Sequence, residues 1–283
     1  MTVYRTVGVG GNFVNWTAAW TWLVALGALT DDYEFEQISD TTETVAFAGQ
    51  ADLGGHNLRF YSSNPHNGDP TKGHRIYLNG AVGPNFFTCR FENGNYSDTF
   101  HLEDLCFRKL DAVDYTMVTL GGYGDGITLY AKNLIIIGND KTIATGLRIH
   151  RRDDRYYLSN IKITNVGHGF NAFYQLLGLT GQDHLTENFT IYDCGSGISW
   201  GAGQRWIFKN CVCAGSTLPG VDWTTIVDGT NIQLINCADS DNSIATGTAS
   251  YINCRPNIIP ADEFKSLNVD NPDWLKLNDG TYT

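Results

Sequence analysis

Two charged segments of the chain carry the residue types that acid–base chemistry needs. Residues 150–155 read His-Arg-Arg-Asp-Asp-Arg, and Asp183-His184 stands in the corresponding part of the next sequence repeat. Two carboxylates and an imidazole within several ångströms of one another can act as general acid and base, for example in the cleavage of a glycosidic bond. Asp153, Asp154, Asp183 and His184 are therefore the candidate catalytic residues.

The same charged residues also have a purely structural interpretation. Runs of charge are common in solvated turns, where they form salt bridges and keep a protein soluble. We favour this interpretation and expect a protein that is not an enzyme, with a polysaccharide lyase or glycosidase as the alternative.

Metal and cofactor sites have weak support. Asp239 and Asp241 alternate with Ser240 and Asn242 as oxygen-bearing side chains, so calcium is conceivable there, but the glycine and distal glutamate of a calcium-binding loop are missing. The chain has no glycine-rich phosphate loop, no zinc-ligand spacing and no nucleophile elbow. We predict no cofactor.

Aromatic residues form the second group of candidates. They make up 12% of the chain, some of them are expected in the core, and a share this high on an exposed surface predicts at least one interface. Those expected in turns or at the ends of repeats can stack on sugars or fill a pocket of a protein partner. The predicted binding residues are Tyr156, Tyr174, Trp200 and Trp223.

A repeated segment positions all of these residues. Each repeat has an asparagine, once an aspartate, directly before an alternating apolar run, and successive repeats lie 17 to 29 residues apart. Short alternating runs rich in Ile, Thr, Tyr and Phe exclude helical repeats and indicate stacked β-coils. Asparagine suits such corners because it tolerates left-handed backbone angles and can bond to the next asparagine in the stack. The predicted ladder consists of Asp104, Asn133, Asn160, Asn188, Asn210, Asn236 and Asn253, and Asn57 and Asn79 are expected to continue it.

The residue after each corner is apolar and is expected to point into the coil. Cys211, Cys237 and Cys254 occupy this position in the last three repeats. Such a column is consistent with a metal site or a disulfide, but small buried thiols that fill a narrow core explain it better.

The fold class that follows is all-β, a single-stranded parallel β-helix in one domain, right-handed by the general preference of parallel crossovers. We place an N-terminal cap at residues 1–40, coils at 41–257 and a C-terminal cap at 258–283. The cap is expected to contain an amphipathic helix over residues 15–29, with Asn15 as N-cap and an apolar face that covers the open end of the first coil. A helix that docks a partner is the alternative for this tryptophan-rich stretch. The predicted apolar face consists of Trp16, Ala19, Trp20, Leu23 and Leu26.

Charge and hydropathy exclude some classes of partner. The chain has 30 acidic and 19 basic residues and a net charge of −11, which disfavours nucleic acid and anionic membranes. The longest apolar stretch, residues 18–29, is too short to span a bilayer. No secretory signal is expected, because no apolar run directly follows the first residues.

The opening Gly8-Val-Gly-Gly-Asn-Phe-Val-Asn-Trp16 and the closing Asn271-Pro-Asp-Trp-Leu-Lys-Leu277 resemble those of the right-handed parallel β-helix proteins of phage virions. This resemblance, together with the general preference of parallel crossovers, implies the right-handed winding. It further implies a virion protein on the phage particle, either a capsid decoration protein or a small tail or fibre subunit. The implied partners are other virion proteins, further copies of the chain, with a trimer as the expected assembly, and surface glycans. The same scaffold serves tailspike glycosidases and pectate lyases, so an enzyme or a carbohydrate-binding module remains the alternative.

Overall fold

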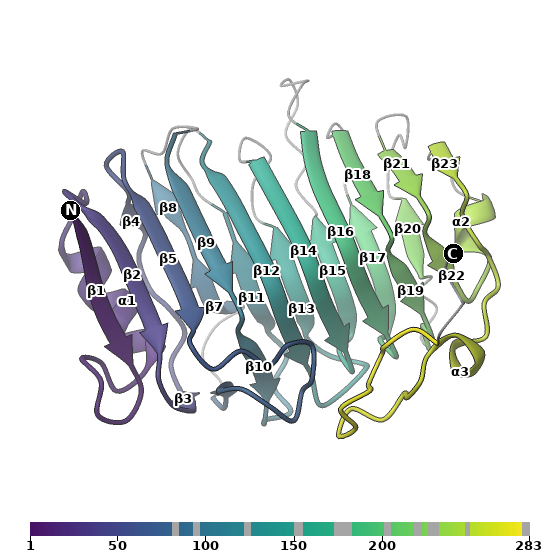
Figure 1. Cartoon of the computed structure of the whole chain (residues 1–283), viewed down its shortest axis with the longest axis horizontal. Helices are drawn as coiled ribbons and strands as arrows, with labels where there is room; N and C mark the ends of the chain where they lie inside the picture. Colours follow the sequence, from purple (N-terminus) through teal and green to yellow (C-terminus); the bar gives the residue numbers. More distant parts are fainter. Residues whose placement is uncertain are drawn as a thin grey trace.

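The computed structural model describes residues 1–80, 85–92, 97–121, 126–149, 155–172, 183–200, 205–217, 222–225, 232–246 and 250–278. It confirms the predicted parallel β-solenoid. In Figure 1 the front strands point downward while the chain advances from left to right, so the coils wind in a right-handed sense. None of the helices in these ranges is long and apolar enough to span a membrane.

The front sheet contains one strand from every coil, and all its pairs are parallel. Strands of stacked coils pair only with their neighbours, so side chains at equal register form columns along the outside of the sheet. In spatial order the strands are β1 (Thr2–Val7), β2 (Asp32–Gln37), β5 (Asn57–Ser62), β9 (Thr99–Glu103), β12 (Thr128–Ile137), β14 (Arg155–Thr164), β16 (Asp183–Tyr192), β18 (Arg205–Lys209), β21 (Ile232–Ile235) and β23 (Ser250–Ile252).

Two further faces close each coil. The second face joins the later halves of β12, β14 and β16 to β3 (Thr41–Glu43), β6 (Arg75–Leu78), β10 (Cys106–Lys109), β19 (Val212–Ala214) and β22 (Ala238–Asp239). The third face, behind the front sheet in Figure 1, contains β7 (Asn85–Cys89), β11 (Thr116–Leu120), β13 (Thr145–Ile149), β15 (His168–Ala172), β17 (Ser196–Trp200) and β20 (Trp223–Thr225). A small pair, β4 (Ala51–Asp52) with β8 (Phe91–Glu92), completes the early coils.

The asparagine ladder lies at the corner between the front and second faces. All seven predicted corner residues have a positive φ, between 51° and 58°. The amide of Asn133 donates to Asp104 at 2.9 Å, and each following asparagine up to Asn236 donates to the one before it at 3.0 to 3.2 Å. The extension to earlier coils was wrong. Tyr61 pairs with Glu103, so Ser62 and not Asn57 takes the corner position before Asp104, and Asn79 follows β6 on another face.

The residues after the corners point into the coil, as predicted. Leu105, Leu134, Ile161, Phe189, Cys211 and Cys237 are buried in one continuous core, and Cys254 packs against it. All seven cysteines are free thiols. Burial raises the pKa of the Cys237 thiol, so the cysteine column behaves as apolar filling.

The N-terminal helix α1 (Trp16–Ala25) is shorter than predicted. Asn15 is the N-cap and accepts a hydrogen bond from Ala18 N at 2.9 Å. Trp16, Ala19, Trp20 and Leu23 are buried, but Leu26 is 41% exposed. The predicted face ends early because Gly27 takes a left-handed φ of 73°, which stops the helix.

The helix start is also held by a residue from a coil. The Glu43 carboxylate, fully buried, accepts from Trp16 N and Thr17 N at 2.9 Å each. A carboxylate at this position satisfies amides that have no partner within the helix.

The short helix α2 (Ser243–Thr246) lies between β22 and β23. The chain after β23 contains the short helix α3 (Pro260–Glu263) and lies along a side of the solenoid. We call residues 258–278 the C-terminal tail, drawn yellow in Figure 1. Its Trp274, Phe264 and Leu275 pack on the apolar outer face of the second sheet. The outer-face residues in this second core are Cys106, Ile135, Ile137, Val212, Ala214 and Ala238.

We expect Asn160→Ala to lower the free energy of unfolding by about 2–4 kcal/mol. The variant loses two amide hydrogen bonds of about 1 kcal/mol each and leaves a Cβ in a left-handed corner at a further cost of about 1 kcal/mol. Asn160→Gly removes the same bonds but accepts the backbone angle, so it should lose less. Urea unfolding of the three proteins measures both effects. Equal losses for alanine and glycine would show that the corner backbone carries no strain.

Candidate functional site

A groove of about 960 Å³ runs along the asparagine ladder. One wall is formed by the ladder side chains from Asn133 to Asn253. The opposite wall is formed by residues 66–68 and by residues 275–277 of the C-terminal tail. Lys162, Thr190 and Val212, from the second face, form the floor between them. We call this feature the ladder groove.

The ladder presents the same polar group at regular intervals. Adjacent coils lie about 4.8 Å apart, so the amides of Asn160, Asn188 and Asn210 repeat at that spacing along an exposed edge. Each amide has two donor hydrogens and two acceptor lone pairs, and the ladder bonds use one of each. The remaining donor and acceptor of the Asn160, Asn188 and Asn210 amides face no hydrogen-bond partner within the described ranges and can bond to a molecule in the groove.

Lys162 joins both parts of the opposite wall to the coils. Its ammonium donates to Gly68 O at 3.1 Å and to Trp274 O at 2.7 Å, and it lies 5.3 Å from the centre of the Trp274 ring. Burial, with the nearby Lys276 charge, lowers the pKa of Lys162 to about 8. The two carbonyls nevertheless hold the charged form, since an ammonium offers three donors and no acceptor.

His66 lies in the wall opposite the ladder, where two hydrogen bonds hold it as a neutral ring. Gly68 N donates to its Nδ1 at 2.9 Å, so Nε2 carries the proton and donates to Asn133 O at 2.7 Å. Burial lowers the pKa of His66, which agrees with the neutral form.

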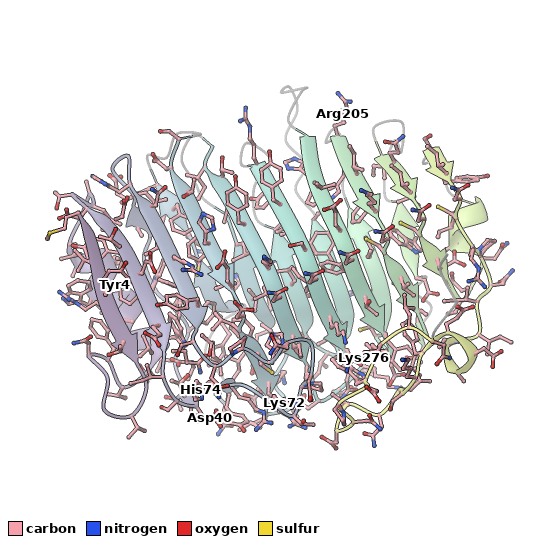
Figure 2. All side chains as sticks on the ribbon, viewed as in Figure 1. Tyr4, Asp40, Lys72, His74, Arg205 and Lys276 are labelled. Carbon is pink, nitrogen blue, oxygen red and sulfur yellow. The ribbon has the colours of Figure 1, made fainter. Side chains whose placement is uncertain are left out.

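The charge of the ladder groove is opposite to that of the whole chain. Its lining contains Lys162, Arg255 and Lys276 and no carboxylate among the described residues. Figure 2 shows Lys276 on the tail at the lower edge of the solenoid. Glu263 pairs with Arg255 at 2.8 Å and Asp273 with Lys276 at 3.0 Å, both from outside the lining. An anionic ligand therefore meets two cations that already pair with carboxylates, and Lys162, whose described hydrogen bonds go to backbone carbonyls.

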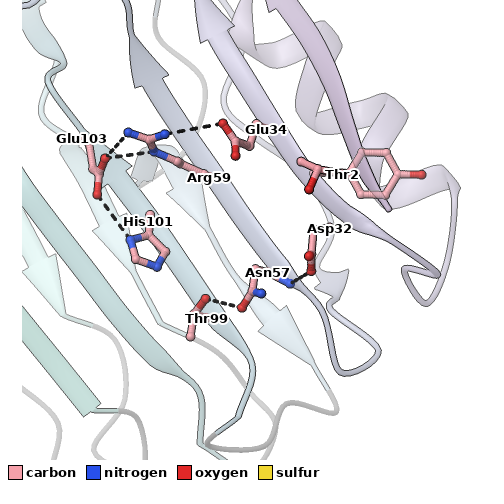
Figure 3. A pocket seen from close by; sticks show the side chains of 9 residues that line it. Thr2, Asp32, Glu34, Asn57, Arg59, Thr99, His101 and Glu103 are labelled. Atoms are coloured by element: carbon pink, nitrogen blue, oxygen red, sulfur yellow. Dashed lines mark hydrogen bonds and ion pairs between the residues drawn. The ribbon is translucent and has the colours of Figure 1, made fainter.

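A second, shallower groove of about 470 Å³ lies on the outside of the front sheet near its N-terminal end (Figure 3). Arg59 donates to Glu103 at 2.7 and 2.9 Å and lies 3.4 Å from Glu34. His101 Nδ1 lies 3.3 Å from the other Glu103 oxygen. These bonds to His101 and Arg59 lower the pKa of Glu103 to about 2, so this carboxyl is an anion and no general acid.

His101 also begins a column of stacked rings on the front sheet. Its ring lies 4.6 Å from that of Tyr130, which lies 5.1 Å from that of Tyr157, and both pairs are nearly parallel. Both faces of the Tyr130 ring are used within the column, so Tyr130 presents its edge and hydroxyl to solvent.

Of the four predicted catalytic residues, the structure describes the side chain of His184 alone. Asp153 and Asp154 lie outside the described residues, and Asp183 begins β16 with a side chain that also lies outside them. The prediction that His184 lies in a solvated turn was wrong: the side chain is 1% exposed, and its ring lies 5.4 Å from that of Tyr156 and 4.6 Å from that of Trp206. Successive residues of a strand face opposite sides, so His184 points into the core.

Of the four predicted aromatic binding residues, two have side chains outside the described residues and two are buried. Tyr174 and the side chain of Trp200 lie outside the described residues. The expected exposure was wrong for Tyr156 and Trp223, which are buried. Tyr156 stacks within the core on Trp206, and the Trp223 indole donates to Ala238 O at 3.4 Å. In the Tyr156-Tyr157 pair it is the second tyrosine that faces outward.

The two candidate calcium ligands hold turns of the last coil. Asp239 accepts from Asn242 N and Asn257 N at 3.0 Å each, and Asp241 accepts from Asp222 N at 2.9 Å. In the part of the chain that the structure describes, no three His, Cys, Asp or Glu side chains are placed to bind a metal.

Comparison with known proteins adds little. No family model and no curated protein matches the chain. Among solved structures, a pectin methylesterase from Aspergillus niger is 15% identical over 88% of each chain, with a TM-score of 0.37. The fold assignment therefore rests on the strand pairing described above.

We expect His184 to make the protein less stable in acid. Burial lowers the pKa of His184 to about 4, below the value of about 6.5 in an unfolded chain, and neither ring nitrogen has a hydrogen-bond partner among the residues that the structure describes. Between these two pH values the unfolded state binds more protons, so stability falls as the pH falls. The loss contributed by His184 should reach about 3 kcal/mol near pH 4.

The measurement is urea unfolding of the native protein and His184→Leu at pH 7 and pH 4.5. The difference in stability between the two proteins should shift in favour of the leucine variant at the lower pH. An unchanged difference would contradict a neutral, buried His184.

Proposed function

We propose that this protein is a non-catalytic β-helix protein that holds an extended glycan along the ladder groove. The observation that carries the proposal is the row of amides that repeats once per coil beside the Lys162 ammonium. Amides bind sugar hydroxyls well because each can donate and accept. A ligand with a repeating unit can use successive amides, whereas a compact ligand reaches only one or two.

The charges of the groove indicate the class of glycan. Lys162, Arg255 and Lys276 line it without a carboxylate among the described residues, in a chain with a net charge of −11. A glycan with carboxylate groups would form charge-assisted hydrogen bonds there. Elsewhere the surface of such an acidic protein repels it.

We also propose that the protein binds the glycan as part of a phage particle. The resemblance of the chain ends to virion β-helix proteins supports a role as a capsid decoration protein or a small tail or fibre subunit. A solenoid with a continuous core and a rigid outer ladder suits a protein that displays a binding surface. Co-purification with virions at a fixed copy number is the expected result, and absence from virions would contradict this role.

Glycan cleavage is the second candidate function, favoured by His101 and Glu103 in the front-sheet groove. A carboxylate bonded to Nδ1 orients an imidazole and leaves Nε2 available as a base. The front-sheet groove is, however, shallow, and its carboxyl partner is fully ionised and paired with Arg59.

We expect Asn210→Asp to weaken the binding of uronate-containing oligosaccharides at least tenfold. The substitution keeps the shape and the left-handed corner, which Asp104 already occupies at a φ of 58°, but it removes the hydrogen bond that the Asn210 amide donates to Asn188 and adds a negative charge to the groove. Isothermal titration calorimetry measures the change. Asn57→Asp, the same substitution on the front sheet outside the ladder groove, is the matched control and should leave affinity unchanged. Equal affinity for the two variants would place the glycan elsewhere.

We expect no new reducing ends and no unsaturated uronate when the pure protein is incubated with acidic polysaccharides. Product formation would overturn the non-catalytic assignment. If His101→Gln then abolished the product while Asn210→Asp did not, cleavage would belong to the front-sheet groove.

A further inference from the structure

The floor of the ladder groove contains one isolated charge. Lys162 pairs in register with Ile135 in the coil before it and with Thr190 in the coil after it, and Thr190 pairs with Val212. Side chains at equal register form a column, so Lys162 lies between an isoleucine and a threonine on the outer face of the second sheet. Its neighbours in the column are therefore uncharged, and the floor beyond Thr190 is apolar at Val212.

Lys162 retains one hydrogen-bond donor for a ligand. An ammonium has three N–H donors. Two of them bond to Gly68 O and Trp274 O, and the described part of the chain offers no acceptor to the third. Lys162 lines the groove, so this third donor can bond to one oxygen of a molecule that lies there. A carboxylate is a strong acceptor for it, because both groups are then charged.

The other two cations of the groove are already paired with carboxylates. Arg255 lies 2.8 Å from Glu263, and Lys276 lies 3.0 Å from Asp273. A ligand carboxylate beside either pair gains little, because the charge of the cation is offset by its acidic partner. Lys162 is therefore the cation that can attract a ligand carboxylate most strongly.

A carboxylate also lies at the beginning of the ladder. Asp104 accepts from the Asn133 amide at 2.9 Å, so the first wall residue of the groove lies beside a negative charge that repels an anion. The wall residues from Asn133 to Asn253 extend over about 24 Å at about 4.8 Å per coil, which is long enough for several sugars. Lys162 lies in the second of these coils, next to Asn160. The groove thus matches a chain that carries one negative charge among neutral units.

We propose that the ligand of the ladder groove is a heteroglycan in which a single carboxylate-bearing sugar is flanked by neutral sugars, and that Lys162 binds the carboxylate. This inference rests on the proposed function of the groove as a glycan site. The neutral sugars bond to the ladder amides through their hydroxyls and place their C–H faces on Val212 and on Leu277, which is 39% exposed.

A polyuronate matches this charge pattern less well. It brings a carboxylate at every sugar, and among the described lining residues only Lys162 is a cation without a carboxylate partner. The other carboxylates of such a ligand add to the repulsion from a protein with a net charge of −11. A single uronate, in contrast, can reach Lys162 from any starting position, because the repeated amides allow the chain to shift along the ladder by whole coils.

The test is isothermal titration calorimetry with hexasaccharides that share a backbone and differ only in charge. The probes are β-1,4-glucan and β-1,4-mannan hexasaccharides in which none, one internal or all of the sugars are oxidised to uronate. The single-uronate member should bind at least tenfold more tightly than the neutral member, because a charge-assisted hydrogen bond contributes about this factor or more. It should also bind at least tenfold more tightly than the fully oxidised member.

A second cation in the same column should change this preference. Thr190→Lys places an ammonium one coil after Lys162, at a partly exposed position, and Thr190→Gln is the neutral control. Thr190→Lys should bind the fully oxidised hexasaccharide at least tenfold more tightly than Thr190→Gln does. Lys162→Gln should bind the neutral and single-uronate members equally. The two Thr190 variants keep the test decisive if Lys162→Gln also loosens the C-terminal tail.

The outcomes separate this inference from the proposed function. Equal or tighter binding of the fully oxidised member would overturn the inference and leave glycan binding in the groove intact. Equal affinities of the native protein for the neutral and single-uronate members would do the same. Binding of no member would contradict the proposed function, and the inference with it.

Discussion

The left-handed corner between the front and second faces is the constraint on which the rest of the structure depends. A parallel coil must turn at the same angle in every layer, and a residue with a Cβ adopts a φ near 53° at a cost unless its side chain compensates. Asparagine compensates because its amide bonds to the next corner in the stack. The geometry that lets the chain turn therefore also aligns the amides, and the ladder groove is a consequence of how the coil closes.

The corner residues were also the most predictable part of the sequence. An asparagine before an apolar residue recurs because each coil makes the same left-handed turn. The pattern can therefore be recognised from several copies in the sequence. Asn57 was wrongly assigned to the ladder, because a single asparagine does not show which position of the coil it occupies. Only the pairing of Tyr61 with Glu103 shows that Ser62 takes the corner in that coil. The inward cysteine column followed from the same local rule and was predicted correctly.

The candidate site was predictable only in part, because it depends on contacts between distant segments. The ladder wall was found from the sequence, but the opposite wall comes from residues 66–68 and from the C-terminal tail. No local pattern relates Gly68, Lys162 and Trp274, which meet through two hydrogen bonds. The errors at His184 and Tyr156 have another cause. In a strand a shift of one residue exchanges the inside and the outside, and an aromatic or histidine side chain is compatible with both.

The C-terminal tail changes how the solenoid is expected to unfold. In a stack where each coil contacts only its neighbours, the terminal coils fray first and the rest can follow one at a time. Here Asp270 reaches Arg108, Trp274 is held by Lys162, and Glu263 pairs with Arg255. These contacts join early, middle and late coils through one segment of chain. The tail thus links coils that lie far apart in the stack, and the coils it contacts are expected to unfold together, as a globular domain does.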